Sequence, residues 1–502
     1  MRNTSKKQEG KRSKRIAKNA KGITLVALVI TIIIIIILAT VTIRFAFTDD
    51  GIIKRAEQAK DMYANDTAYT DQSMANATAY LDEMLNGVTG GSSDEENPPT
   101  PTPPTDGTYS EEEKVNTPQL VSNMKLVVYD ENNNTWIEDT TKSAYSYKDT
   151  AIAGANSSEW ANAEVTVDGI TSYFVWIPRY AYKITYYTDE NKTTTSSTKT
   201  KYGIIDIKFI KGTGKETVDG TPCKYASENP TAEDYIVHPA FTDEEENGGW
   251  DSQLPGIWIG KYEVSLANKA NESNIVTNDT GTGNILLSEH TDKTIVTKPG
   301  YSSWRYITIG NMYTNALAYD TNLNSHMLKN SEWGAVAYLT ESKYGRNGTE
   351  IGHSDKGYIT GGGAETDAIE TNADQSTTGN VYGIYDLRGG ANERVASYYN
   401  GSDVNTTNLN NGSSFASVNG ESTKYATAYT GTNASTAYKY GDATYETSGW
   451  HSDNAVFVYS NLPFFLRGGL YSHVASGTGV FYYFYYGGGA DADNSFRLAL
   501  VL

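Results

Sequence analysis

The chain opens with a basic stretch and then becomes abruptly apolar. Residues 23–43 read ITLVALVITIIIIIILATVTI and contain no charged side chain. A helix of about 20 such residues spans the hydrocarbon core of a bilayer. We therefore predict a transmembrane or pilin-type helix over residues 23–43, with residues 1–22 as a basic leader before it.

The periodicity changes after the apolar run. Over residues 44–89, apolar side chains recur at offsets of three and four, the spacing of one helix face. No heptad persists for three repeats, so a coiled coil is not indicated. We predict a stalk helix over residues 44–89 that continues the membrane helix. Its apolar stripe consists of Ile52, Ile53, Ala56, Ala59, Met62, Tyr63, Ala77, Tyr80, Leu81, Met84 and Leu85.

A proline-rich, acidic stretch follows over residues 90–108. Its prolines exclude a regular helix or a central strand, and they favour an extended spacer of about 3 Å per residue. This stretch is the predicted linker, and residues 109–502 are the predicted body. The prolines are Pro98, Pro99, Pro101, Pro103 and Pro104.

The body has short apolar runs separated by long stretches rich in Gly, Asn, Ser and Thr. The segments SYFVWIPRYAYKITYY (172–187) and GIWIGKYEVS (256–265) are typical of strands. The segment MLKNSEWGAVAYLTESKYG (327–345) predicts a helix, with Ser331 as its N-cap. Few helices among many loops indicate one large, loop-rich α+β domain. We expect Trp333, Val336, Ala337 and Leu339 on the buried side of the helix.

Charge then orients the chain. The net charge is −19, but residues 1–22 hold nine Lys or Arg and a single Glu. Basic flanks of a membrane helix stay in the cytoplasm, so we expect a single-pass protein of the cell membrane with an extracellular acidic body. An acidic body also argues against nucleic acid as its ligand.

The leader leaves two interpretations open. One is a plain signal anchor. The other rests on AKNAKGITLVALVITI, in which Gly22 precedes Ile23, and which resembles the class III leader of type IV prepilins. That resemblance implies cleavage after Gly22 by a prepilin peptidase and methylation of Ile23. The fifth residue after the cut is Ala27, where the family usually has Glu, and this departure bears on assembly into an ordinary pilus.

Four segments of the body resemble, in order, the motifs of the formylglycine-generating enzyme family. The resemblance implies a variant C-type lectin-like fold, in which Trp333, Tyr385 and Phe496 belong to the core and Gly468 and Gly469 form a tight backbone turn. The segments are PGIWIGKYEVS (255–265), HMLKNSEWGAVAY (326–338), GNVYGIYDLRGGANERV (379–395) and FLRGGLYSHVASGTGVF…SFRLALV (465–501).

Catalysis is not expected. Family members that oxidise cysteine bind copper through two cysteines near the C-terminus, and this chain has the single Cys223. Iron-dependent relatives use a separate histidine-bearing domain, and the six histidines here show no paired ligand spacing. We therefore predict no metal cofactor, with calcium as the open alternative. The run GGGADADNS offers Asp491, Asp493 and Asn494 as oxygen ligands, but we favour the interpretation as a polar turn.

The C-terminal stretch GVFYYFYYGGGADADNSFRLALVL begins at Gly479 and is dense in aromatic residues. An exposed strand of this kind is prone to aggregation and needs cover or a partner. Tyrosine among Gly, Ser and Asn is also the composition of antibody binding loops. Because side chains alternate along a strand, only half of the four tyrosines need be exposed. The predicted ligand-binding residues are Tyr471, His473, Tyr482, Tyr483, Tyr485, Tyr486, Asp491 and Asp493, and the predicted core anchors are Phe481, Phe484 and residues 496–502.

This layout, with an insert between Arg467 and Arg497, is similar to the variable proteins of diversity-generating retroelements. Errors at adenines in Asn codons cannot produce Lys, Glu, Gln, Met or Trp, and residues 470–495 contain none of these five. We expect a bacterial surface adhesin whose head binds an external protein or glycan. The alternatives are a copper- or iron-dependent oxidoreductase of the same fold, and a minor pseudopilin of a secretion system.

Overall fold

The computed structural model describes residues 108–502, apart from 153–156, 245–248, 268–294 and 363–368. These residues belong to one compact unit, Pro101–Leu502. The predicted leader, membrane helix, stalk helix and nearly all of the linker lie outside the described residues, and so do Gly22 and Ile23. Within the described part of the chain, no helix is long and apolar enough to cross a membrane.

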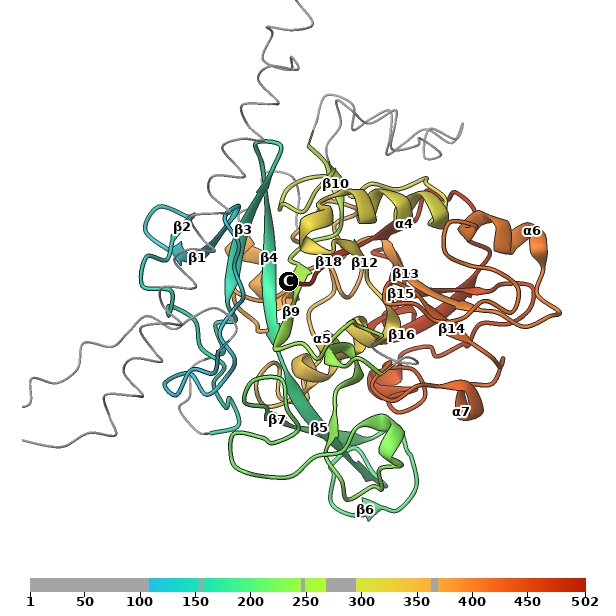
Figure 1. The fold of residues 1–502 in the computed structure, drawn as a ribbon, viewed down its shortest axis with the longest axis horizontal. Helices are drawn as coiled ribbons and strands as arrows, with labels where there is room; N and C mark the ends of the chain where they lie inside the picture. The colour runs from blue at the N-terminus through green and yellow to red at the C-terminus, as the bar shows by residue number, and fades with distance from the viewer. Residues whose placement is uncertain (1–107, 153–156, 245–248, 268–294, 363–368) are drawn as a thin grey trace, which may run out of the picture. The chain divides into compact units, whose positions relative to one another are not determined.

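The larger sheet joins the beginning and the end of the body (Figure 1). All its neighbouring strands are antiparallel. The C-terminal strand therefore lies in the interior of this sheet, between its first and third strands. The last residues of the chain thus complete the sheet. In order, the strands are β12 (His326–Met327), β18 (Leu498–Leu500), β9 (Gly256–Gly260), β4 (Ile170–Pro178), β3 (Asn162–Val167), β1 (Met124–Asp130) and β2 (Thr135–Glu138).

A second sheet holds the aromatic C-terminal stretch. Its central strand β13 pairs in parallel with β14 and β17 and antiparallel with β15, and β15 pairs with β16. This places β16 at one edge of the sheet. The strands are β14 (Thr427–Tyr429), β13 (Asn392–Tyr399), β15 (Phe464–Gly469), β16 (Thr478–Tyr486) and β17 (Asn494–Phe496).

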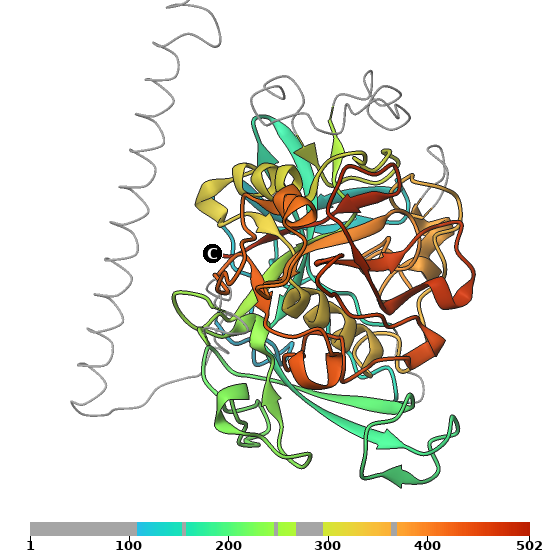
Figure 2. The ribbon, with the colours of Figure 1, turned by 90° about the vertical axis from the view of Figure 1, so that its right-hand side faces the viewer.

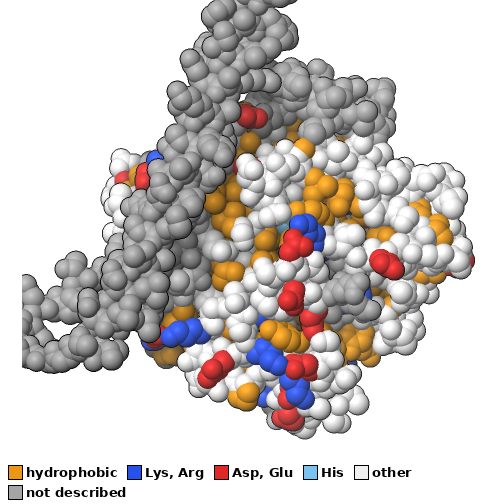
Figure 3. All heavy atoms as spheres, viewed as in Figure 1, with side chains coloured by type: hydrophobic (Ala, Val, Ile, Leu, Met, Phe, Trp, Pro, Cys, Tyr) orange, Lys and Arg blue, Asp and Glu red, His pale blue; other side chains and the backbone are white. Residues whose placement is uncertain are grey.

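A long hairpin of β5 and β7 projects from the lower part of the body in both Figure 1 and Figure 2. It carries two short additional strands. Charged side chains gather over this lower region in the space-filling view of Figure 3. The four strands of this sheet are β5 (Tyr180–Tyr187), β6 (Thr195–Ser196), β7 (Gly203–Phe209) and β8 (Ile236–Val237), and a further small sheet pairs β10 (Ser265–Leu266) with β11 (Ile295–Val296).

The described helices are few and short, so the body is sheet-rich, as the predicted α+β class requires. The predicted helix is α5, and all of its residues are buried, not only those of one face. Its N-cap is Lys329, and Ser331 lies inside the first turn, so the predicted cap was wrong. The Glu332 carboxylate takes the capping role instead, because it accepts a hydrogen bond from the Lys329 backbone N–H at 2.7 Å. The helices are α4 (Ile309–Ala318), α5 (Asn330–Glu341), α6 (Thr406–Leu409) and α7 (Ala434–Ala437).

A buried arginine joins the two main sheets. Arg497 lies between β17 and β18 and forms an ion pair with Glu393 of β13. It also donates hydrogen bonds to the carbonyl of Gly260 in β9 at 2.8 Å and to that of Tyr385 at 2.9 Å. A buried guanidinium needs such partners to offset its lost hydration. The predicted anchoring of the last residues in the core is confirmed, and Trp333, Tyr385 and Phe496 are buried as predicted.

The two glycines after Arg467 adopt the predicted tight conformation. Gly468 and Gly469 have φ angles of 76° and 82°, a region that side chains rarely adopt. A Cβ on Gly469 would lie 2.1 Å from the Gly477 carbonyl oxygen. Here the register between β15 and β16 shifts, which starts the turn that leads into β16.

Candidate functional site

The aromatic strand β16 is covered along its outer edge. Residues 454–456 run beside it, where the Tyr483 N–H donates to the Asn454 carbonyl and the Val456 N–H donates to the Tyr483 carbonyl at 3.0 Å. An edge strand with its backbone groups paired in this way offers less of a template for another chain. The aggregation hazard suggested by the sequence is therefore reduced by local cover.

The tyrosines of β16 do not alternate between buried and exposed along the strand. Tyr482 and Tyr483 are 5% and 1% exposed, although they point to opposite sides of the strand. Tyr483 packs against Phe457 and Phe465, and Tyr482 stacks on Phe484. Burial raises the pKa of both phenols to about 12. Of the predicted binding tyrosines in β16, only Tyr485 and Tyr486 are half-exposed, while the predicted anchor Phe481 is buried and Phe484 is only half-buried.

Beyond β16, five side chains meet at the surface and form what we call the Tyr/Asp cluster. The Tyr486 hydroxyl donates to Asp491, and the Tyr358 hydroxyl donates to Asp493 at 2.5 Å. Tyr471 lies edge-on to Tyr358, with ring centroids 4.8 Å apart. All five residues are half-buried. Their rings and carboxylates are therefore held in place and still reach solvent.

Two buried arginines fix the loop that carries the cluster. Arg394 donates to the carbonyl of Gly488 at 2.7 Å and to that of Gly489, and Arg305 donates to the carbonyl of Ala492. The Arg305 guanidinium also lies 3.4 Å from the centroid of the Tyr358 ring, a favourable cation–π geometry. The two guanidinium groups thus hold the backbone of residues 488–492 in place from the buried side, while the side chains of the cluster reach solvent.

The structure does not bring all predicted binding residues together. Tyr485 contacts Tyr459 instead of the cluster, with ring centroids 5.0 Å apart. His473 is exposed in the turn before β16, with its Nδ1 atom 3.2 Å from the Gly477 carbonyl oxygen. Conversely, Tyr358 was not predicted. It lies 135 residues before Asp493, and no local pattern in the sequence connects them.

The carboxylates proposed for calcium are already used as acceptors. Asp491 and Asp493 accept hydrogen bonds from tyrosine hydroxyls, and the Asn494 side-chain oxygen accepts one from Asn392 at 3.1 Å. Among the residues that the structure describes, no group of three or more His, Cys, Asp or Glu side chains is arranged to hold a metal ion. The predicted absence of a metal cofactor, and calcium as its alternative, both stay predictions.

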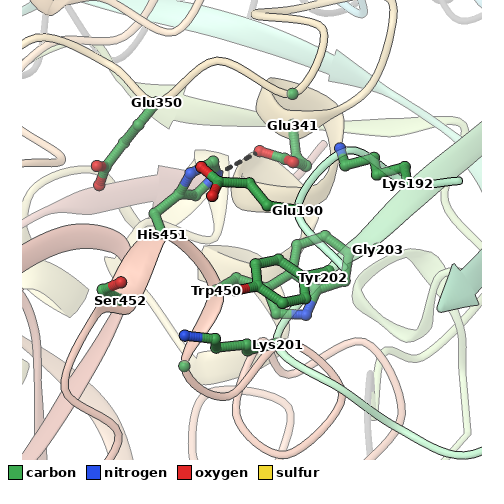
Figure 4. Close-up of a pocket in the computed structure, with 12 residues that line it drawn as sticks. Glu190, Lys192, Lys201, Tyr202, Gly203, Glu341, Glu350, Trp450, His451 and Ser452 are labelled. Atoms are coloured by element: carbon green, nitrogen blue, oxygen red, sulfur yellow. Dashed lines mark hydrogen bonds and ion pairs between the residues drawn. The ribbon is translucent and has the colours of Figure 1, made fainter. Parts of the chain in front are cut away.

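A second feature, which was not predicted, is a cavity of about 530 Å³ that we call the charged pocket (Figure 4). Three separate segments line it: the loop and strand start at 190–203, the end of α5 with the following loop at 341–350, and residues 449–452. In Figure 4, Glu341 and His451 point toward each other, with Lys192 and Lys201 on other sides of the cavity.

The pocket contains groups that titrate near neutrality. The Nε2 atom of His451 lies 2.8 Å from a carboxylate oxygen of Glu341. Burial alone would lower the pKa of His451, but the hydrogen bond and charge of Glu341 raise it overall. Burial raises the pKa of Glu350 to about 7, against the lowering effect of the Arg388 guanidinium 3.4 Å away. Protonation of this pocket therefore changes within the physiological range.

The segment that carries His451 is strained and touches β16. His451 and Ser452 have φ angles of 52° and 69°, which cost non-glycine residues free energy and often mark functional positions. The His451 ring lies parallel to that of Phe481, with centroids 6.0 Å apart. Asp453 accepts a hydrogen bond from the Phe481 N–H at 3.1 Å. The pocket is thus packed against the buried half of the aromatic strand.

The single cysteine of the chain is remote from both features in the sequence. Cys223 is 7% exposed and packs with Ala181, Ile210 and Val237. Burial raises the pKa of its thiol to about 11. At neutral pH the thiol is protonated, and this state is unsuited to nucleophilic chemistry.

Comparison with known proteins gives distant structural likenesses. No family model and no curated protein matches the chain. Among solved structures, it is similar to Treponema denticola variable protein 1, at 10% identity and a TM-score of 0.29, over 68% of this chain and 99% of that one. It is also similar to PvdO from Pseudomonas aeruginosa, at 11% identity and a TM-score of 0.28, over 66% of this chain and 95% of that one. At these TM-scores we base no functional argument on either likeness.

Proposed function

We propose that the body is the non-catalytic recognition head of a bacterial surface protein, which binds an external protein or glycan through the Tyr/Asp cluster. In this proposal the head has the variant C-type lectin-like fold of the formylglycine-generating enzyme type. The preceding residues anchor it in the cell membrane or in a pilus-like filament.

The observation that supports this function is the contrast between the fixed loop and its outward side chains. Arg305 and Arg394 hold the backbone of residues 488–492, so little conformational entropy is lost when a ligand binds. Tyr471, Tyr486 and Tyr358 supply rigid aromatic area with polar tips, which is the chemistry of effective binding surfaces.

The proposal assigns different roles to the tyrosines of β16. Tyr482 and Tyr483 belong to the support, because they are buried. Tyr486 belongs to the contact surface, together with Tyr471, Asp491 and Asp493. Tyr485 and His473 lie outside the cluster and serve as secondary contacts.

A binding experiment with the full chain tests this function. The purified protein, in detergent, is applied to an array that carries defined glycans and, in separate wells, bacterial and host surface proteins. The double variant Tyr471→Ala/Tyr486→Ala should lose at least about tenfold in affinity for whatever the native chain binds. Tyr440→Ala, which alters another half-buried tyrosine outside the cluster, should bind normally.

Thermal unfolding of the same variants provides the necessary check. The double variant should keep a melting temperature within a few degrees of the native value, because both residues are only half-buried. Unchanged binding by the double variant would contradict the proposal. A loss of binding that occurs together with general unfolding would show that these tyrosines are structural.

A further inference from the structure

The composition of the charged pocket restricts what it can bind. Half of the residues that line it are Glu, Lys or His: Glu190, Lys192, Lys201, Glu341, Glu350 and His451. Pockets for apolar ligands are lined mainly by hydrophobic and aromatic side chains. A largely apolar molecule would strip water from these charges without replacing it, so the occupant must itself be strongly polar.

The lysines of the pocket lie on one wall, together with Glu190, and the other two glutamates lie on a second wall. Lys192 and Lys201 belong to the segment between β5 and β7, whereas Glu341 and Glu350 belong to α5 and the loop after it. Neither lysine forms an ion pair with a carboxylate of the described residues. One oxygen of Glu350, Oε1, is buried and has no hydrogen-bond partner there. Lysines without an ion pair are available to a ligand. The other oxygen of Glu350 lies 3.4 Å from Arg388, so this carboxylate has one oxygen left for a further polar partner.

Lys192 and Glu341 are close together but do not pair with each other, because Glu341 pairs with His451 through its other carboxylate oxygen. A Cβ built on Gly348 would lie 3.3 Å from the Lys192 Nζ atom and 3.8 Å from Glu341 Oε1. These two atoms therefore lie within about 7 Å of each other. A ligand that carries an anion and a cation a few ångströms apart can contact both at once, and a charge-assisted hydrogen bond at each end gives it affinity and a fixed orientation.

A neutral sugar fits the pocket less well. Sugar rings commonly stack their apolar face on an open aromatic side chain, which supplies contact area that hydroxyls do not. Trp450 is only 2% exposed. The Lys201 ammonium lies 5.2 Å from the centroid of the Tyr202 ring, where the apolar face of a sugar would otherwise stack. Trp450 thus offers no free ring face, and Lys201 occupies one face of Tyr202.

The backbone of the third wall gives an independent indication of function. His451 and Ser452 both hold left-handed conformations, and such strain persists where the surrounding structure imposes it. The His451 ring faces Glu341 at 2.8 Å, and this contact fixes the orientation of the carboxylate.

From these observations we propose that the charged pocket binds a small zwitterion of the amino-acid or short-peptide class. The ligand ammonium contacts Glu341 and Glu350, and the ligand carboxylate contacts Lys192 and Lys201. This site is separate from the Tyr/Asp cluster and does not depend on its function.

Calorimetric titration of the purified full chain tests the proposal. The probes are L-alanine and glycylglycine as zwitterions, acetate and ethylammonium as the separate charged halves, and glucose as a neutral polar molecule. We expect the zwitterions to bind at least about tenfold more tightly than either half, since each half forms only one set of charged contacts. Glucose should not compete.

Variants then locate the site. Lys192→Ala and Lys201→Ala should each weaken zwitterion binding by about tenfold, because the ligand carboxylate loses a charged donor. Lys356→Ala, which removes an exposed lysine outside the pocket, should bind like the native chain, and so should Tyr471→Ala/Tyr486→Ala. The proposal is overturned if neither zwitterion binds at concentrations up to about 10 mM. A dissociation constant above this limit is weaker than that of most specific sites. It is also overturned if the pocket variants bind normally.

Discussion

The Tyr/Asp cluster and the charged pocket both border β16, yet their polar groups are satisfied in opposite ways. In the cluster, the tyrosine hydroxyls pair with carboxylates and the buried arginines pair with backbone carbonyls. In the pocket, Lys192 and Lys201 have no carboxylate partner among the described residues, and a glutamate oxygen is left over. The cluster thus presents a fixed surface, although the Nε atom of Arg394 is also buried without a hydrogen-bond partner in the described part of the chain, whereas the pocket keeps charges that a ligand can contact.

The largest effect on the contrast between the two regions should come from removing Arg394, which holds the loop of the Tyr/Asp cluster in place. Arg394→Ala leaves the Gly488 and Gly489 carbonyls without their charged donor and opens a cavity. We expect a loss of about 3 kcal/mol or more in the free energy of unfolding, measured by urea denaturation. Arg394→Met, which restores much of the volume, should lose less. Zwitterion binding by the folded fraction should be unchanged, and a coupled loss would show that the two regions are not independent.

Glu350 of the pocket should contribute to the pH dependence of stability, alongside Glu446 and Asp386, whose pKa values burial raises to about 7 and about 6. The ordinary pKa of a glutamate is 4.5, and burial raises that of Glu350 to about 7. Between these values the folded chain keeps a proton that the unfolded chain has lost, so this contribution to stability is complete below pH 4.5 and falls as the pH rises toward 7. The effect is on the order of 2–3 kcal/mol.

Glu350→Gln should therefore flatten the decline in melting temperature between pH 5 and pH 8. The exposed Glu138→Gln is the matched control and should keep the native slope. Tyr486 does not contribute in this range, because burial raises the pKa of its phenol to about 12. An unchanged slope in Glu350→Gln would contradict the contribution assigned to Glu350.

A smaller effect is expected from the cluster's own hydrogen bonds. Tyr486→Phe removes the hydroxyl that donates to Asp491 and keeps the ring. Because both groups reach solvent, water replaces the lost partner, and we expect a loss of about 1 kcal/mol in the free energy of unfolding. A loss as large as that of Arg394→Ala would mean that the hydroxyl, and not the buried arginine, holds the loop.

The smallest effect should come from the pocket lysine at the rim. Lys201 is exposed and forms no ion pair among the described residues, so Lys201→Ala should change stability by less than about 0.5 kcal/mol. The same substitution is expected to weaken zwitterion binding. A substantial loss of stability would show that Lys201 already has a structural role, and the contrast between the two regions would disappear.

The strands and the helix were predictable because their signals are local. The apolar segments at 172–187 and 256–265 form β4, β5, β9 and the start of β10, and the segment around Trp333 forms α5. The glycine turn after Arg467 and the buried end of the chain were also predictable. In each of these cases a short stretch contains both the pattern and its cause.

The errors and omissions have a common physical origin in contacts between distant segments. Alternation along β16 suggested outward tyrosines, but residues 454–457 and Phe465 cover Tyr483. Tyr358 joins the cluster from another part of the chain, and the charged pocket combines residues that are more than 100 positions apart. The predicted N-cap at Ser331 failed because the Glu332 carboxylate caps the helix from within it. Patterns in a window of the sequence do not contain this information.

The buried cysteine provides the body with an intrinsic reporter of motion. Cys223 is the only cysteine of the chain, and it is packed against β5 and β8. A maleimide reagent can modify it only when that packing opens, since the closed thiol is both inaccessible and protonated. The rate of labelling of the native protein, followed by mass spectrometry, therefore measures how often the hairpin sheet separates from its own small core.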